Sequence, residues 1–347
     1  MVTKIGLDLG YAYITTSDVN AAVKREPSVV LVDKDTRRII SVGEAAYNSN
    51  SENGMLVRPF KNGLLFDGPI TRGVIENAIG SVQSADKVRC VIGVSAGFLP
   101  KQEKEIFEMM NAAGADECFS VTRSVAALIG AGYSPNMSVI SVNIGAKTTE
   151  ITVLYRGKIF SSVAQSVGGE DFDRAVKEYV LEQGDVNVSL SIARSIKEHL
   201  GAVWSGRSPE PIEIEGTLSL TGNRVKMSIG AEDIVGVFEA PLRSILTAVA
   251  NAVKKIPLDF VEEIFENGIV LTGGGAELFG LDIMMEKVLD IKVRKPRDAM
   301  DSVAKGLARI NNIMPLRMRS NNKNITQQLS RYYESKKKES SAVRKSN

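Results

Sequence analysis

Two short glycine-containing turns carry the clearest chemical signal in this sequence. One lies in Ile5-Gly-Leu-Asp-Leu-Gly-Tyr-Ala-Tyr-Ile14, and the other lies in Val139-Ile-Ser-Val-Asn-Ile-Gly-Ala-Lys-Thr-Thr-Glu-Ile-Thr-Val-Leu154. Such a turn brings backbone N–H groups close to an anionic ligand, because a glycine has no Cβ to stand in the way. Two similar hairpins predict two similar halves that close on one phosphate-bearing ligand.

The elements around these turns recur in one order along the chain. Each turn joins two apolar, alternating stretches, and further strands and helices follow in both halves. The pattern predicts a mixed α/β chain with an internal duplication. A ligand cleft is expected between the halves, where binding sites commonly lie. In the second half, one long helix is expected from Ala231 to about Lys255.

Composition limits the class of protein. The 347 residues are 44% hydrophobic and 24% charged, which is typical of a soluble protein with two domains. No apolar run approaches the roughly 20 residues of a membrane span. Cys90 and Cys118 lie in apolar stretches and are predicted to be buried thiols of a reducing compartment. His199 is the single histidine, which argues against a histidine-based triad or zinc site.

Charge is distributed unevenly along the chain. The net charge is +2, but residues 315–347 contain nine Lys or Arg and two Glu, a net of +7. The rest of the chain is therefore near −5. A basic tail on a mildly acidic body predicts contact with an anionic surface or partner. The alternative is a solvated, disordered tail without a specific role.

A third glycine turn completes a resemblance to the actin, Hsp70 and hexokinase superfamily, and within it to bacterial actins of the MreB kind. Asp8-Leu9-Gly10 is similar to the first phosphate loop and Asn143-Ile-Gly-Ala-Lys-Thr-Thr149 to the second. Thr272-Gly-Gly-Gly-Ala276 resembles the adenosine loop. Arg25-Glu-Pro-Ser-Val-Val30 and Val167-Gly-Gly-Glu-Asp-Phe-Asp173 also match, and the similarity covers about residues 3–312.

The resemblance implies an α/β chain with an actin-like ATPase fold. Two related lobes, each with a mixed sheet flanked by helices, would enclose a nucleotide cleft. The first lobe is expected at residues 1–138, with a small subdomain inserted at 31–67. The second is expected at 139–314, with a small subdomain inserted at about 180–255. Residues 315–347 are expected to form a disordered basic tail.

The resemblance also implies a site for ATP or ADP with Mg²⁺. Asp8 would hold Mg²⁺ through water molecules, because this ion keeps much of its hydration shell. The alternative is a turn aspartate that bonds nearby N–H groups. The expected nucleotide contacts are Asp8, Gly10, Tyr11, Gly145, Ala146, Lys147, Thr148, Lys197, Glu198, Gly273, Gly274 and Gly275.

Several of these positions leave two interpretations open. Lys147 stands where the family has glycine, and it could reach a phosphate as a point charge or point to solvent. Lys197 and Glu198 match a pair that binds adenosine, or they form a solvated pair of charges. Tyr11 and Tyr13 replace smaller side chains, and they could crowd or cover the terminal phosphate.

The catalytic carboxylates that the family implies are absent from their expected positions. Thr122 and Arg123 stand where relatives carry the glutamate that orients the attacking water, and Asn143 stands where they carry aspartate. Losing such a group typically costs about 10²–10⁴ in rate. Weak or absent hydrolysis is therefore expected, with nucleotide binding better preserved.

The resemblance implies a cytoplasmic, filament-forming protein that serves cell shape or intracellular organisation. Head-to-tail contacts between copies would give the filament. One alternative is a non-polymerising scaffold or regulator of another bacterial actin. A small-molecule kinase is less well supported, because no carboxylate is placed for the acceptor. The basic tail offers a contact with an acidic partner or with an anionic membrane, which would place the protein beside the inner membrane, and no specific nucleic acid is expected.

Overall fold

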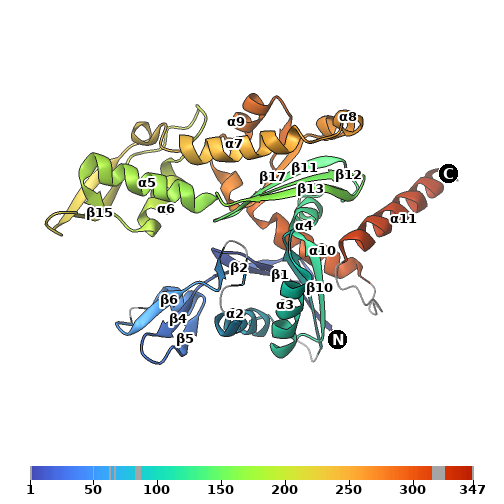
Figure 1. The fold of residues 1–347 in the computed structure, drawn as a ribbon, viewed down its shortest axis with the longest axis horizontal. Coiled ribbons are helices and arrows are strands. Elements are labelled where there is room, and N and C mark those ends of the chain that lie inside the picture. The colour runs from blue at the N-terminus through green and yellow to red at the C-terminus, as the bar shows by residue number, and fades with distance from the viewer. Residues whose placement is uncertain are drawn as a thin grey trace. The chain divides into compact units, whose positions relative to one another are not determined.

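The structure is a computed structural model that describes residues 2–49, 51–61, 64–65, 68–82, 87–314 and 325–345. Figure 1 shows its helices and strands. The chain groups into two compact units. The first contains Met1–Ser141, Thr152–Val163 and Asp301–Asn347, and the second contains Val142–Ile151 and Ala164–Met300. Within the described ranges, no helix combines the length and the apolar character needed to cross a bilayer.

The first unit is built on a mixed five-stranded sheet with the order β10-β9-β1-β2-β3. Strand β1 is parallel to β9 and antiparallel to β2, so the sheet combines a hairpin with crossover connections. Strand β10 is parallel to β9, and β3 is antiparallel to β2. The strands are β1 (Val2–Leu9), β2 (Tyr13–Ser17), β3 (Val23–Pro27), β9 (Lys87–Val94) and β10 (Glu117–Thr122).

A second five-stranded sheet has the order β13-β12-β11-β17-β18. Its strands are β11 (Val139–Ile144), β12 (Thr149–Tyr155), β13 (Lys158–Gln165), β17 (Ile269–Thr272) and β18 (Val293–Arg294). In both sheets, three consecutive strands are followed, beside the first of them, by two strands from later in the chain. This strand-for-strand correspondence confirms the duplication predicted from the two glycine turns.

Smaller sheets occupy the connections. One has the order β5-β4-β6, one pairs β7 with β8, and one has the order β14-β15-β16. Within the predicted insertion 31–67, residues 50, 62–63 and 66–67 lie outside the described ranges. The elements are β4 (Val30–Asp33), β5 (Ile39–Val42), α1 (Glu44–Tyr47), β6 (Gly54–Val57), β7 (Phe60–Lys61), β8 (Leu64–Leu65), β14 (Val186–Asn187), β15 (Ile212–Leu218) and β16 (Arg224–Ile229).

The helices follow the predicted alternation, with one correction. The helix expected from Ala231 to about Lys255 is wrong in its first third. A 3₁₀ turn, Glu232–Ile234, comes first, and Gly236 then adopts φ 86°, which ends helical geometry before α7 begins. The helices are α2 (Gly68–Gly80), α3 (Pro100–Ala112), α4 (Arg123–Gly130), α5 (Gly169–Gly184), α6 (Leu190–Leu200), α7 (Glu239–Val253), α8 (Leu258–Asn267), α9 (Leu281–Leu289), α10 (Ser302–Ile313) and α11 (Thr326–Lys345).

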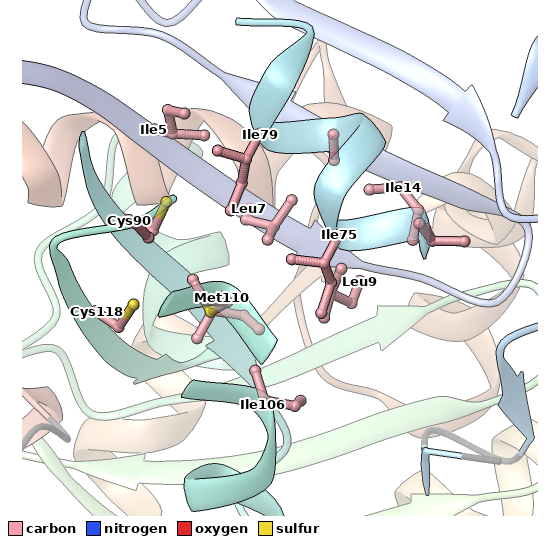
Figure 2. Packing of buried hydrophobic residues seen from close by; sticks show 14 of the residues in the cluster. Ile5, Leu7, Leu9, Ile14, Ile75, Ile79, Cys90, Ile106, Met110 and Cys118 are labelled. Carbon is pink, nitrogen blue, oxygen red and sulfur yellow. The ribbon is translucent and has the colours of Figure 1, made fainter. Parts of the chain in front are cut away.

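Alternation along β1 divides the first sheet into two faces. Odd-numbered residues point toward α2 and α3, where they form an apolar core with both helices and with β9 (Figure 2). Burial of each such aliphatic side chain contributes about 1.5–3 kcal/mol. Cys90 and Cys118 lie in this core as free, buried thiols, as predicted, and burial raises the pKa of Cys90. The labelled members are Ile5, Leu7, Leu9, Ile14, Ile75, Ile79, Cys90, Ile106, Met110 and Cys118.

Helix α10 packs on the opposite face, against β1, β2 and β9, and it also contacts α4. The two helices meet through glycine. A Cβ at Gly306 would lie 1.8 Å from the carbonyl oxygen of Ala126, and one at Gly130 would lie 1.7 Å from that of Ser302. The backbones therefore touch directly. This contact fixes the position of α4, whose first residue is Arg123.

The described part of the C-terminal segment docks on the first unit. The N–H of Ile325 donates to the carbonyl of Ser120 at 2.9 Å, and the N–H of Thr122 donates to Oγ1 of Thr326 at 3.0 Å. Leu329 is buried in α11. Residues 315–324 and 346–347 of the predicted tail lie outside the described ranges. Helix α11 is thus hydrogen-bonded to β10, the strand that ends at Thr122, directly before Arg123.

The backbone contact between α4 and α10 gives a stability prediction. Gly306→Ala should force the helices apart and lower the free energy of unfolding by about 3 kcal/mol, the cost of overpacking a rigid site. Thermal unfolding of the purified protein measures the change. Gly80→Ala is the matched control, because a Cβ there meets no atom within 4 Å. Equal unfolding temperatures for the two variants would contradict the packing argument.

Candidate functional site

The first glycine hairpin connects β1 to β2. The N–H of Gly10 donates to the carbonyl of Tyr13 at 3.0 Å and closes the turn. A Cβ on Gly10 would lie 2.6 Å from that carbonyl oxygen, so this tight turn requires glycine. Asp8 is the second-last residue of β1, at the carboxyl end of the strand that leads into this hairpin.

The second hairpin, between β11 and β12, has the same closing bond. The N–H of Gly145 donates to the carbonyl of Thr148 at 2.9 Å. The first two N–H groups of α5, on Gly169 and Glu170, donate to the carbonyls of Gly145 and Ala146 at 2.9 and 2.8 Å. The turn that includes Lys147 is therefore closed by its own hydrogen bond and is also bonded to the start of α5. The shared closing bond makes the two hairpins geometric counterparts.

Asp8 is paired with Arg123. The guanidinium donates from Nε to Oδ1 of Asp8 at 2.8 Å and from Nη2 to the carbonyl of Leu9, also at 2.8 Å. The side chains are 22% and 17% exposed, so water screens this pair only in part. Neither the metal role nor the local-turn role considered for Asp8 includes this partner.

The sheet explains why Arg123 reaches Asp8. In the strand register, Asp8 on β1 lies beside Gly93 on β9, and Gly93 lies beside Val121 on β10. The chain leaves β10 at Thr122, and Arg123 begins α4. A Cβ at Gly93 would stand 3.2 Å from Cγ of Arg123. The missing side chain at Gly93 therefore opens the path across the middle strand.

A second arginine holds the same hairpin. Nη1 of Arg58 donates to the carbonyl of Tyr11 at 2.9 Å, and its guanidinium lies 4.8 Å from the centre of the Tyr11 ring. This distance is within the range of a cation–π contact. The hairpin at residues 8–13 is thus contacted by two guanidinium groups, which attach at its start and at its tip.

Lys147, in the second hairpin, is paired with a carboxylate of the same unit. Its Nζ lies 2.8 Å from Oε1 of Glu170, and Nη2 of Arg174 donates to the same oxygen at 2.7 Å. The Lys147 side chain is only 17% exposed, so it does not extend into solvent. At the start of α5, Oδ2 of Asp171 accepts a hydrogen bond from the N–H of Gly168 at 2.8 Å.

Lys197, on α6, lies at the same end of α5. Its Nζ is 2.6 Å from Oδ1 of Asp173 and 3.1 Å from the carbonyl of Gly169. Asp173 is only 1% exposed, and Arg194 contacts its other oxygen at 3.4 Å. Glu198 is exposed. The two neighbours therefore have different environments, and only Lys197 is part of the buried ionic cluster.

The third glycine turn packs on β11. A Cβ at Gly273 would lie 2.8 Å from Oδ1 of Asn143, and one at Gly275 would lie 2.2 Å from Cγ2 of Ile144. Oγ1 of Thr272 donates to Oδ1 of Asn143 at 3.3 Å. Gly274 has more room, with Met300 as its nearest neighbour at 3.4 Å. The Asn143 side chain thus accepts a hydrogen bond from β17, the strand that leads into this turn.

The first hairpin does not fit a bound Mg²⁺. In proteins, Mg²⁺ is bound by oxygen atoms, either directly or through its own water molecules, and a carboxylate usually balances its positive charge. Here Asp8 is already bonded to the guanidinium of Arg123, whose positive charge opposes a second cation. Within the described ranges, no group of three or more histidine, cysteine, aspartate or glutamate residues is arranged to hold a metal ion.

The predicted residues thus form two groups, one in each unit. The first contains Asp8, Gly10 and Tyr11 with Thr122 and Arg123. The second contains Asn143, Gly145, Ala146, Lys147 and Thr148, together with Gly273, Gly274, Gly275 and Lys197 near the start of α5. Sequence reasoning missed Arg58. It also missed that Arg123, Glu170 and Asp173 are the ionic partners of Asp8, Lys147 and Lys197, respectively. The available signal was a positive side chain standing where a carboxylate or glycine is expected.

Comparison with known proteins identifies the family. The family model for MreB/Mbl proteins matches residues 2–317. The chain is 28% identical over 312 residues to the cell shape-determining protein Mbl of Bacillus cereus, covering 87% of this chain and 93% of that protein. It is 29% identical over 319 residues to the cell shape-determining protein MreB of Escherichia coli, covering 87% and 91%.

Solved structures agree on the fold. MreB 5 of Spiroplasma citri bound to AMPPNP superposes with a TM-score of 0.82 at 20% identity, covering 88% of this chain and 95% of that one. The MamK double helical filament superposes with a TM-score of 0.78 at 20% identity, covering 91% and 100%. These matches confirm the predicted actin-like fold. With the family match across residues 2–317, they show that this chain belongs to the MreB/Mbl family of actin-like, cell shape-determining proteins.

Proposed function

We propose that this chain is a nucleotide-binding, filament-forming cytoskeletal protein that hydrolyses ATP weakly or not at all. Its process would be cell shape or intracellular organisation. The observation that carries the proposal is the matched pair of glycine hairpins, closed by Gly10 and Gly145 through the same hydrogen bond at 3.0 and 2.9 Å. They occur in a chain that covers more than nine tenths of its cell shape-determining relatives.

Nucleotide binding is supported by the hairpin geometry and by relatives. The MreB5 structures of Spiroplasma citri are bound to AMPPNP and to ADP. In this chain, each turn begins with a glycine, which lets the backbone approach an anionic phosphate closely at that residue. ATP or ADP is therefore the proposed ligand, and the three glycine-containing turns are its proposed contacts.

Weak hydrolysis is supported by what replaces the carboxylates. A water molecule that attacks phosphorus needs a group to orient it and accept its proton. Arg123 has no acceptor, because a guanidinium has only N–H donors and stays protonated. The Asn143 amide cannot serve as a base, and its Oδ1 accepts from Thr272. This chemistry supports nucleotide binding with weak or absent turnover.

Self-assembly is supported by the fold and by one relative in particular. The MamK structure with a TM-score of 0.78 is described as a double helical filament. Head-to-tail contact between identical subunits gives an open chain when the rotation does not close a ring. Another copy of this protein is therefore the proposed first partner.

The second candidate function is a non-polymerising scaffold or regulator of another bacterial actin. The replacement of carboxylates by Arg123 and Asn143 favours it, because slow or absent cleavage of the nucleotide would not time filament turnover. The proposed location is the cytoplasm. Contact with an acidic partner, or with the inner membrane through the basic residues after 315, remains part of the proposal.

Assembly separates the two candidates. Purified protein incubated with ATP should sediment and show filaments by negative-stain electron microscopy, whereas nucleotide-free protein should sediment less. The non-hydrolysable analogue AMPPNP should support assembly as well as ATP, because turnover is not needed. Protein that binds nucleotide yet stays monomeric in all three conditions would favour the scaffold instead.

Restoring the missing carboxylates should raise hydrolysis. The double variant Arg123→Glu/Asn143→Asp supplies a water-orienting group at each altered position, and phosphate release should increase by about tenfold or more. Asn223→Asp/Arg224→Glu makes the same change of charge at two exposed positions, in the turn before β16 and at its first residue, and it should leave the rate unaltered. A wild-type rate equal to that of an active bacterial actin would refute the loss of catalysis.

A further inference from the structure

We propose that Arg123 takes the electrostatic place of a divalent cation at the first hairpin, so that this chain binds the phosphates of its nucleotide without Mg²⁺. The inference rests on the proposed nucleotide-binding function and adds the ionic form of the ligand. Its starting point is that the first hairpin does not fit a bound Mg²⁺. The one carboxylate at the hairpin, that of Asp8, already has a cationic partner that belongs to the protein.

The local charges favour a metal-free anion. Arg58 and Arg123 both contact the hairpin at residues 8–13, and together with the Asp8 carboxylate their charges sum to +1. Without the arginines, the hairpin would carry −1 and would attract a divalent cation. With them, it attracts phosphate oxygens and repels Mg²⁺, and both effects are strengthened by partial burial.

The position of Arg123 is built into the fold. Its guanidinium is fixed at two points, on Oδ1 of Asp8 and on the carbonyl of Leu9, each at 2.8 Å. Its stem crosses the space left by Gly93 and lines a mainly apolar pocket with residues that include Leu9, Phe60 and Ile92. An arginine on the surface that contacted a carboxylate by chance would have neither the space at Gly93 for its stem nor the second hydrogen bond, to the carbonyl of Leu9.

Permanence of charge makes the arginine a suitable substitute. A guanidinium stays protonated in proteins, and its planar donors match carboxylate and phosphate oxygens. A bound Mg²⁺ must instead be recruited from solution and partly dehydrated. The charge at the hairpin is therefore present before the nucleotide arrives, whatever the metal concentration.

Calorimetric titration of the purified, nucleotide-free protein with ATP tests the proposal. The dissociation constant measured in excess EDTA should be no larger than the one measured in excess MgCl₂. MgCl₂ alone, without nucleotide, should give no binding heat and no shift in unfolding temperature. These measurements need no variant.

A substitution adds the causal test. Arg123→Gln removes the charge and leaves the Asp8 carboxylate without this partner. Affinity for ATP in EDTA should fall by about tenfold or more, the effect of losing a charge-assisted contact, and MgCl₂ should restore part of it. Arg72→Gln is the matched control, because Arg72 is exposed on α2 and pairs with Glu76. It should leave both constants unchanged.

The outcomes separate this inference from the function on which it rests. ATP binding that requires MgCl₂ in the wild-type protein would overturn the inference and leave the proposed function standing. Absence of ATP binding in both buffers would overturn the proposed function itself. An Arg123→Gln variant that folds and keeps wild-type affinity in EDTA would also overturn the assignment to Arg123.

Discussion

The ion pair between Asp8 and Arg123 links three strands of the first sheet at one edge. Asp8 is the second-last residue of β1, Arg123 directly follows β10, and Gly93 on β9 has no side chain to fill the space between them. The pair can form only if all three strands are in register and if α4 begins where β10 stops. The glycine contact between α4 and α10 enforces that position. One interaction at the hairpin therefore depends on the packing of both faces of the sheet.

The ion pair gives the first hairpin a cationic side chain, while its backbone keeps the conformation of a glycine turn. The turns at Gly10 and Gly145 retain identical closing bonds, so the elements that approach an anion are intact. Cationic side chains contact residues of these turns: Arg123 pairs with Asp8, Arg58 donates to the carbonyl of Tyr11, and Lys147 itself pairs with Glu170. A protein altered in this way can keep its affinity for an anionic ligand while losing the acid and base that cleave it. Family membership and a weakened reaction are thus compatible.

The backbone could be predicted from the sequence more completely than the site. Glycine turns between alternating apolar stretches are local signals, so both hairpins and the duplicated strand order could be predicted from them. The partner of Arg123 could not be predicted, because it lies 115 positions away and is reached only across the space at Gly93. The environment of Lys147 likewise depends on α5 folding back onto the turn. The long helix from Ala231 failed because Gly236 adopts a positive φ that no apolar periodicity reveals.

The docked C-terminal segment has a practical consequence for anyone who labels this protein. Oγ1 of Thr326 lies 3.0 Å from the backbone nitrogen of Thr122 and 3.1 Å from its hydroxyl, one residue before Arg123. Ser330 and Asn136 add a second attachment through the carbonyl of Ser330 at 3.1 Å. A truncation before this segment would remove both attachments, and a fluorescent fusion that pulled the helix away would do the same. A reporter is therefore better inserted at an exposed loop, such as the turn around Gly222, than attached to α11.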